Sequence, residues 1–323
     1  MKKNSLLRRL TKSREFNILM LVIAVAVIMT IATPYFFSVN NLKTVGIGLA
    51  IDGLLVIGMT MVLATGGVDL SVGSLMALTC MIAATTHINM GMNITLSVII
   101  AIAIGGCLGT FNGFMIGKVG ITPLIVTLAM MGMGRGLTYV ATKGATVAVS
   151  SAPASFLVLG GGSLMGIPIL IILIVAFVVV FDILTRRMLL FRRMYYTGSN
   201  EKTAMLSGID IRKTKIITYM MCGLLCGLAG ILTLSRFTVA TPNIGMGAEM
   251  RIISACVIGG ASLSGGMGTV TGSILGLILL SFINNGLILL DVSIYWQDFI
   301  SGAILLAAVT MDTVSNKNIR LAS

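Results

Sequence analysis

The feature that most constrains this chain is a series of apolar stretches, most of them about 20 residues long, that fill it almost from end to end. A helix needs about 20 consecutive apolar residues to cross the hydrocarbon of a bilayer. The stretches show helical periodicity or none, and they lack the strict apolar–polar alternation that a membrane barrel requires. Only 10% of the 323 residues are charged, against roughly 25% in a soluble domain. The sequence therefore predicts an all-α membrane protein.

We expect about ten transmembrane helices, and we expect the whole chain, 1–323, to form one transmembrane domain. The expected spans lie near 17–37, 44–64, 68–86, 94–117, 121–141, 165–185, 215–235, 247–262, 268–290 and 295–312. The turn at 65–69 is short, and so is the eighth span. One or two helices are therefore expected to be discontinuous, with breaks near 65–69 or 259–268, as in many transporters.

The two expected breaks resemble each other in sequence. Residues 66–73 read Gly-Gly-Val-Asp-Leu-Ser-Val-Gly, and residues 259–266 read Gly-Gly-Ala-Ser-Leu-Ser-Gly-Gly. A second echo pairs Asn112-Gly113 with Asn285-Gly286, at a different spacing. The pattern suggests an internal repeat.

The distribution of basic residues predicts the orientation of the chain. With an even number of spans, both termini lie on one side, and that side carries 17 of the 22 Lys and Arg residues: six in 1–15, Lys118, eight in 186–215, and Lys317 with Arg320. Lys and Arg are enriched in cytoplasmic loops. We therefore expect a cytoplasmic N-terminus (1–15), a cytoplasmic loop (186–214) and a cytoplasmic tail (313–323). The net charge of +12 then reflects orientation and not nucleic-acid binding.

The sequence shows no catalytic, nucleotide-binding or metal site. The nearest approach to a phosphate loop ends at Gly117-Lys118, but it has Asn112 where Gly is needed and Val119 where Ser or Thr is needed. One histidine, His87, leaves no nucleophile–base–acid set. The five cysteines lie inside apolar segments and are expected to be small core residues. We expect no enzyme activity and no cofactor on this chain.

Polar residues inside the expected spans are candidates for a substrate pathway, because such groups are costly in a membrane. The candidates are Asp69, Asn112, Arg135, Asn284 and Asn285. Each also has a structural interpretation: a helix cap for Asp69, helix–helix hydrogen bonds for the amides, and an interfacial position for Arg135. Asp52, inside the second span, has no assigned role.

The longest polar interruption of the chain, 194–215, predicts a short exposed helix. Asn200 is a favourable N-cap, Glu201 suits the first turn, and Gly208 suits the position after the helix end, which predicts a helix from Glu201 to Ser207. Its apolar residues are Ala204, Met205 and Leu206. A short helix with exposed apolar residues is typical of a docking surface, although a simple surface loop is the alternative.

Several motifs give the chain a family resemblance. Residues 196–209, Tyr-Thr-Gly-Ser-Asn-Glu-Lys-Thr-Ala-Met-Leu-Ser-Gly-Ile, resemble the cytoplasmic loop of ribose/xylose-type sugar permeases of ATP-binding-cassette (ABC) importers. Residues 66–74, 122–128, 257–268 and 284–287 match the same family. The resemblance extends from about Phe36 to Ala308. Asp52 belongs to no motif of the family.

The resemblance implies a function, partners and a location. It implies a bacterial inner-membrane, multi-pass permease subunit that imports a ribose-like monosaccharide by alternating access. The implied partners are a second copy or close relative, a cytoplasmic ATPase that holds ATP and Mg²⁺, and a periplasmic or lipid-anchored sugar-binding protein. The ATPase-coupling residues would be Gly198, Asn200, Glu201, Ala204, Leu206, Ser207 and Gly208.

Two alternatives to sugar import remain open at this point. One is a sister ABC permease for another small solute, such as a furanosyl signal, a nucleoside or a branched-chain amino acid. The other is a secondary transporter that works without partner subunits, for which Asp52 and Asp69 are the available intramembrane carboxylates.

Overall fold

The computed structural model describes residues 14–293 and, beyond them, 295–297, 299–300, 302–304, 306–307 and 309–310. The described residues are mainly helical. The long helices are α2 (Arg14–Ala32), α3 (Val39–Ala64), α4 (Val72–Ile88), α5 (Ile94–Phe114), α6 (Pro123–Thr142), α8 (Ile169–Arg187), α11 (Ile211–Phe237) and α13 (Val270–Leu289). Most of the N-terminal segment 1–15 and the tail 313–323 lie outside the described residues, and the expected tenth span, 295–312, is described only in fragments.

Shorter elements connect the long helices. They are a π-helical turn η1 (Met115–Val119), α7 (Ala154–Gly161), α9 (Leu189–Ser199), α10 (Glu201–Leu206) and α12 (Ala248–Ile258). Four two-residue strands form two antiparallel pairs. β1 (Val147–Ala148) pairs with β4 (Val239–Ala240), and β2 (Ser163–Leu164) pairs with β3 (Ile167–Pro168).

Seven described helices are long and apolar enough to cross a membrane. These are α2, α3, α5 with η1, α6, α8, α11 and α13, which correspond to seven of the ten expected spans. The expected span 68–86 is a helix of only 17 residues that begins at Val72, and the expected span 247–262 is an 11-residue helix that ends at Ile258. The described residues therefore support a multi-pass all-α membrane protein without reaching a count of ten.

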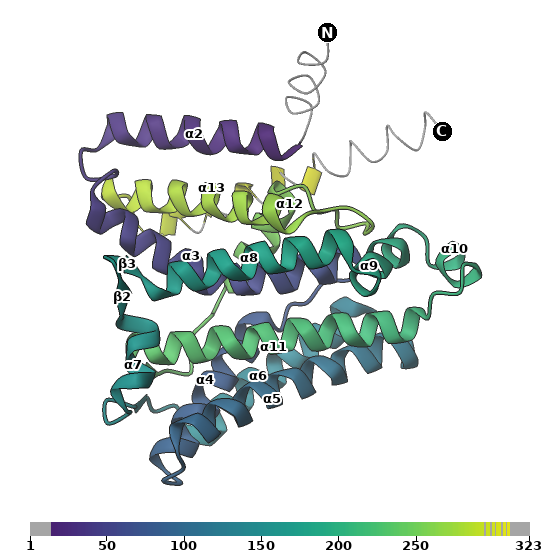
Figure 1. The fold of residues 1–323 in the computed structure, drawn as a ribbon, viewed down its shortest axis with the longest axis horizontal. Coiled ribbons are helices and arrows are strands. Elements are labelled where there is room, and N and C mark those ends of the chain that lie inside the picture. The colour runs from purple at the N-terminus through teal and green to yellow at the C-terminus, as the bar shows by residue number, and fades with distance from the viewer. Residues whose placement is uncertain are drawn as a thin grey trace.

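The helices run side by side in two sets, which Figure 1 shows with α2, α13, α3 and α8 in the upper set and α11, α4, α5 and α6 in the lower one. Helix α3 lies at the contact between the sets and packs against α11, α8, α12 and α13. Its second half is entirely buried from Gly53 to Ala64. Helices α11 and α5 approach closely at glycines: a Cβ atom on Gly223 would overlap the carbonyl oxygen of Gly105.

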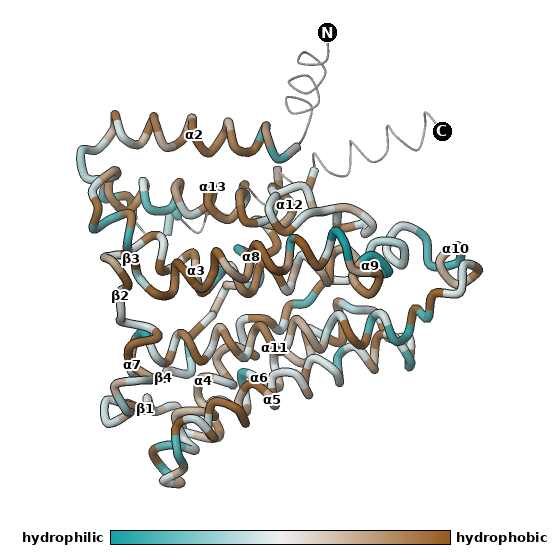
Figure 2. Tube along the Cα trace, viewed as in Figure 1, coloured by the Kyte–Doolittle hydropathy of each residue, from teal (hydrophilic) through white to brown (hydrophobic). Residues whose placement is uncertain are grey.

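The molecule has two distinct ends. One carries α9 and α10, which project beyond the helix sets, and we call it the α10 end (Figure 1). The other carries α7 and the four short strands, and we call it the β1–β4 end. Most of the long helices consist mainly of hydrophobic residues, whereas hydrophilic residues gather around α9 and α10 (Figure 2).

The chain is non-helical at both of the places where a break was expected. Helix α3 ends at Ala64 and α4 begins at Val72, while α12 ends at Ile258 and α13 begins at Val270. Gly66 (φ 78°) and Gly260 (φ 92°) adopt left-handed backbone conformations that other residues rarely adopt. We call residues 65–71 break 1 and residues 259–269 break 2.

Candidate functional site

Local capping determines where α10 begins and ends. The side-chain oxygen of Asn200 accepts a hydrogen bond from the backbone N–H of Thr203 at 3.0 Å, as expected of an N-cap. Glu201 is in the first turn, and Gly208, just beyond the end, has a φ of 79°. The predicted short helix is thus present, and it ends at Leu206, one residue earlier than expected.

Helix α10 is tied to the start of α11 by polar contacts. The carboxylate of Glu201 lies 2.6 Å from the ammonium of Lys215. Asp210 caps α11 by accepting the backbone N–H of Lys213 at 3.0 Å. This hydrogen bond and the nearby Lys213 ammonium lower the pKa of Asp210 from its usual 3.8. The segment 200–215 is therefore a braced unit, in spite of its short helix.

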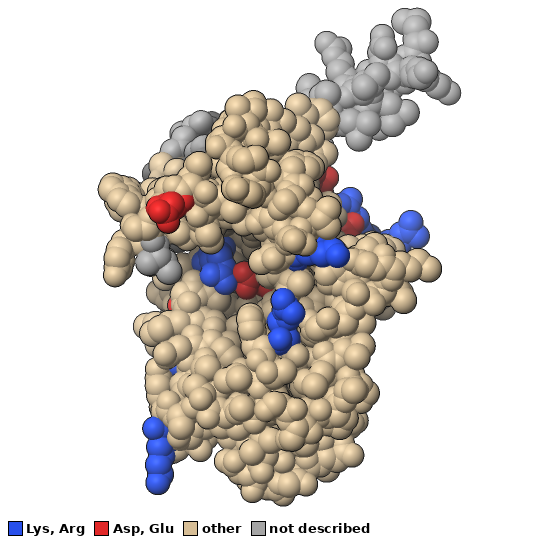
Figure 3. All heavy atoms as spheres, turned by 90° about the vertical axis from the view of Figure 1, so that its left-hand side faces the viewer, with Lys and Arg blue, Asp and Glu red and all other residues tan. Residues whose placement is uncertain are grey.

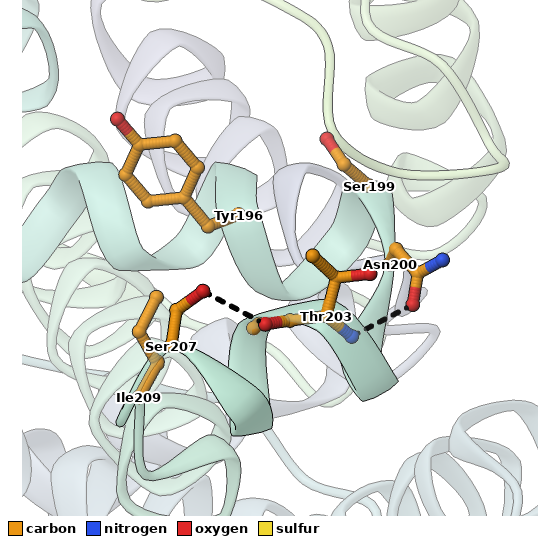
Figure 4. A pocket seen from close by; sticks show the side chains of 7 residues that line it. Tyr196, Ser199, Asn200, Thr203, Ser207 and Ile209 are labelled. Carbon is orange, nitrogen blue, oxygen red and sulfur yellow. Dashed lines mark hydrogen bonds between the residues drawn. The ribbon is translucent and has the colours of Figure 1, made fainter.

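The surface of α10 is apolar and exposed. Leu206 is 89% exposed and Met205 is 64% exposed, whereas Ala204 is buried against the rest of the segment. A hollow of about 360 Å³ lies beside them, and Figure 4 shows the side chains that line it: Tyr196, Ser199, Asn200, Thr203, Ala204, Ser207 and Ile209. Two exposed apolar side chains next to a hollow match the helix-and-groove type of protein contact.

Gly198, near the end of α9, lies where both breaks meet. A Cβ atom on Gly198 would overlap the carbonyl oxygen of Ala64 and lie 2.7 Å from the backbone nitrogen of Gly266. The Gly266 N–H itself donates to the Ala64 oxygen at 3.0 Å. We call this contact of α9, break 1 and break 2 the three-way junction. It brings the two similar sequences together beside the segment that carries α10.

Two of the predicted pathway residues lie together in break 1 and α5. Asp69 is fully buried, and one of its carboxylate oxygens accepts both the N–H and the hydroxyl of Ser71, at 2.9 and 2.5 Å. The side-chain N–H of Asn112, also fully buried, donates to the Ser71 hydroxyl at 3.2 Å. Asp69 therefore stabilises the turn that precedes α4, but the N-cap position of α4 is occupied by Ser71 and not by Asp69.

The structure places the other three predicted pathway residues elsewhere. Asn285 exchanges two side-chain hydrogen bonds with Asn41, at 2.8 and 2.9 Å, and so joins α13 to α3. Asn284 is half-buried within α13, and its side chain makes no hydrogen bond to a described residue. Arg135 donates to the carbonyl oxygens of Pro242 and Ile244, at 2.5 and 2.8 Å, and so holds the segment before α12. The contacts of Asn285 are those of helix packing, whereas Arg135 anchors the segment that leads into α12.

One ion pair inside the helix sets was not predicted from the sequence. Asp52, which had no assigned role, forms a two-pronged ion pair with Arg251, with distances of 3.0 Å (Nε to Oδ2) and 3.1 Å (Nη2 to Oδ1). The partners are 199 residues apart, on α3 and α12, so no local spacing pointed to the pair. The only signal was an acidic residue in the middle of an apolar stretch.

Comparisons with known proteins identify transport proteins that the chain resembles. The model of a protein family described as "Branched-chain amino acid transport system / permease component" matches residues 47–309. The ribose import permease protein RbsC of Escherichia coli K12 is 38% identical over 92% of each chain, and that of Bacillus subtilis is 38% identical over 88% of each. The L-arabinose transport system permease protein AraH of Escherichia coli K12 is 35% identical over 94% of this chain and 92% of its own length. No solved structure matches the chain.

The family match covers most of the chain, and the relatives align with nearly all of it. On this evidence, the chain belongs to the transport-system permease family whose members include its ribose and L-arabinose permease relatives.

Proposed function

We propose that this chain is the membrane-spanning subunit of an ATP-driven importer of a ribose-like sugar. The observation that carries the proposal is similarity along the whole chain to permeases named for ribose and L-arabinose import. The match extends through the break sequences and the α9–α10 segment, the parts that structure and sequence single out. Transport of this kind needs no catalytic residues on the permease, because a separate ATPase subunit binds ATP and Mg²⁺.

The geometry supports a route for mechanical coupling. The ATPase subunit docks on Met205, Leu206 and the adjacent hollow, and its closure pushes on α10. Because α10 is braced against α11 by Glu201 and Lys215, the push moves α9 and α11 together. At the three-way junction, backbone contacts pass this motion to both breaks. The breaks are the elements that rearrange when the pathway opens to one side of the membrane and closes to the other.

This assignment has consequences for orientation and assembly. The α10 end faces the cytoplasm, together with both termini, in a bacterial inner membrane, and the chain forms one permease domain. The β1–β4 end then faces the periplasmic or lipid-anchored sugar-binding protein that delivers the substrate. A second copy or a close relative completes the pathway. The concentration of Arg and Lys in the segment 186–215 supports this orientation.

A related ABC permease for a branched-chain amino acid is the second candidate, and the description of the family model favours it. A zwitterionic substrate needs separate positive and negative partners. Asp52 and Arg251 are the strongest candidates for such partners, but they are bound to each other through both prongs. A site whose charges already neutralise each other suits a neutral sugar better than a zwitterion. The relatives that align with nearly the whole chain, which are named for ribose and L-arabinose, also favour a sugar.

Reconstitution tests the proposed function. The chain is placed in proteoliposomes with its ATPase and binding protein. Uptake of radiolabelled ribose is measured with and without ATP on the side of the membrane that carries the ATPase. We expect uptake that requires ATP and all subunits. Ribose or leucine uptake by the chain alone, driven by an H⁺ or Na⁺ gradient, would show a secondary transporter instead.

A further inference from the structure

The ion pair between Asp52 and Arg251 lies deep in the molecule but is not sealed. Asp52 is halfway along α3, with half of a membrane-crossing helix on either side of it. Arg251 is in the first turn of the half-length helix α12. The side chain of Arg251 is 39% exposed and that of Asp52 is 19% exposed. A partly exposed charged pair at this depth is typical of a transport pathway, because charged side chains that face lipid there are very costly.

Further charged side chains surround the pair. Glu249, two residues before Arg251, is half-buried and interacts electrostatically with both Arg251 and Arg135. Arg135 reaches across from α6 to hold the carbonyl oxygens of Pro242 and Ile244. Two acidic and two basic groups thus gather around the start of α12, and their formal charges cancel. We call Asp52, Arg135, Glu249 and Arg251 the α12 charge cluster.

The α12 charge cluster lies halfway along α3, and its Glu249 lies beside Gly73 at the start of α4. The segment that leads into α12 comes from β4, at the β1–β4 end (Figure 2). Figure 3 views that end directly, and it shows Lys or Arg atoms next to Asp or Glu atoms in a recess between the upper and lower parts of the face. A solute that arrives from this end therefore meets charged groups of both signs in this recess.

The cluster retains hydrogen-bonding capacity that its own members do not use. The second guanidinium nitrogen, Nη1, of Arg251 makes no hydrogen bond to a residue that the structure describes. The same holds for the carboxylate of Glu249 among the described residues. Guanidinium donates only and carboxylate accepts only, whereas a sugar hydroxyl does both. Neighbouring hydroxyls of a sugar can accept from Arg251 and donate to Asp52 or Glu249 at the same time.

We propose that the α12 charge cluster is the sugar-recognition site of the pathway, in which the Asp52–Arg251 pair hydrogen-bonds the hydroxyls of a neutral polyol. This inference rests on the proposed function and adds the site and its ligand chemistry. The pair is fixed by two bonds, so it presents donors and acceptors in a defined orientation. Because the cluster is neutral overall, it does not hold an ion that would block a neutral substrate.

A purely structural ion pair makes a different prediction from a recognition site. Replacing a buried ion pair by neutral groups of similar size is often tolerated, whereas removing one partner is not. The informative variants are therefore Arg251→Lys, which keeps the charge but loses the planar fork, and the double variant Asp52→Asn with Arg251→Gln, which leaves no unpaired charge. Asp291→Asn, at an exposed position after α13, is the matched control for the acid-to-amide change.

The experiment measures ATP-driven ribose uptake by the assembled importer with saturating ribose-loaded binding protein. Co-purification of the ATPase subunit reports that each variant is folded. A second readout is the rise in melting temperature of the assembled complex with added ribose, compared with leucine. We expect both informative variants to lose at least about tenfold in uptake, which corresponds to about 1.4 kcal/mol. We also expect them to lose the ribose-induced thermal shift, while Asp291→Asn retains both.

Three results separate the possible failures. Wild-type uptake in the double variant would reduce the pair to a structural ion pair and overturn the proposal. A thermal shift by leucine but not by ribose would also overturn it, because the cluster would then recognise a zwitterion. Absence of ribose uptake by the wild-type importer would instead refute the proposed function, independently of the cluster.

Discussion

Replacing Gly198 by alanine is expected to separate α9 from both breaks. The added methyl group would overlap the carbonyl oxygen of Ala64 and lie 2.7 Å from the backbone nitrogen of Gly266. Both neighbours are backbone atoms, one at the end of α3 and one in break 2, so neither can rotate out of the way. Alanine is better than glycine in a helix by about 1 kcal/mol. Overpacking of this kind costs about 1–3 kcal/mol, or more where backbone must move. We therefore expect a net destabilisation of about 1–2 kcal/mol.

The matched control is Gly132→Ala in α6. A Cβ atom on Gly132 would have no neighbour within 4 Å, so only the gain in helix propensity remains. We expect this control to be more stable than the wild type by about 0.5–1 kcal/mol. The two glycine-to-alanine changes thus have opposite signs and differ by about 1.5–3 kcal/mol, because their contacts differ.

The assays are thermal unfolding of the assembled complex and the number of ribose molecules imported per ATP hydrolysed. Gly198→Ala should lower the melting temperature and reduce import per ATP, whereas Gly132→Ala should do neither. If Gly198→Ala has wild-type stability and wild-type coupling, the three-way junction is not a tight contact and the coupling route through it is wrong.

Three further predictions concern the polar contacts. Glu201→Lys and Lys215→Glu should each reduce the number of ribose molecules imported per ATP, and the double charge swap should restore part of it. In a double-mutant cycle of thermal unfolding, the coupling energy of the two residues should be about 0.2–1 kcal/mol. Additive effects would show that the contact between Glu201 and Lys215 does not brace α10 against α11. Because the pKa of Asp210 is lowered, the stability that its carboxylate contributes is present above pH 3.8 and is lost as the pH falls through the lowered pKa. Asp210→Asn keeps a capping oxygen but does not titrate, so the melting temperature of this variant should fall less steeply with pH on the acid side. An unchanged acid side of the profile would contradict this. Asn285→Ala should lower stability by about 0.6–2 kcal/mol in chemical unfolding without changing the concentration of ribose that gives half-maximal uptake; a changed ribose dependence would return Asn285 to the pathway.

The parts of the structure that follow from local sequence were predictable. The long helices follow from apolar stretches about 20 residues long, as α3 and α13 illustrate. Helix α10 follows from Asn200 and Gly208, because a cap acts within three or four residues of itself. The breaks at 65–71 and 259–269 were indicated by paired glycines, which are needed where φ is positive.

The parts that depend on distant contacts were not predictable. An apolar stretch gives an upper limit to a helix, and the actual ends of α4 and α12 depend on where breaks 1 and 2 fold against α9. The pairing of Asp52 with Arg251 joins residues 199 apart and has no local signature. Asn285 was recognised as a polar residue in a span, but its partner Asn41 decides that it joins two helices.

Docking of the ATPase subunit on α10 is tested most directly by cysteine cross-linking. Leu206→Cys, 89% exposed on α10, is compared with Met165→Cys, 97% exposed in the β2–β3 turn at the opposite end, in a background without the native cysteines. A short cross-linker with a maleimide at one end, which reacts with the introduced cysteine, and a succinimidyl ester at the other, which reacts with lysine side chains of a partner, is added to membranes that contain the assembled importer. We predict a cross-link from position 206 to the ATPase subunit and none from position 165. A cross-link from 165 but not from 206 would contradict the account.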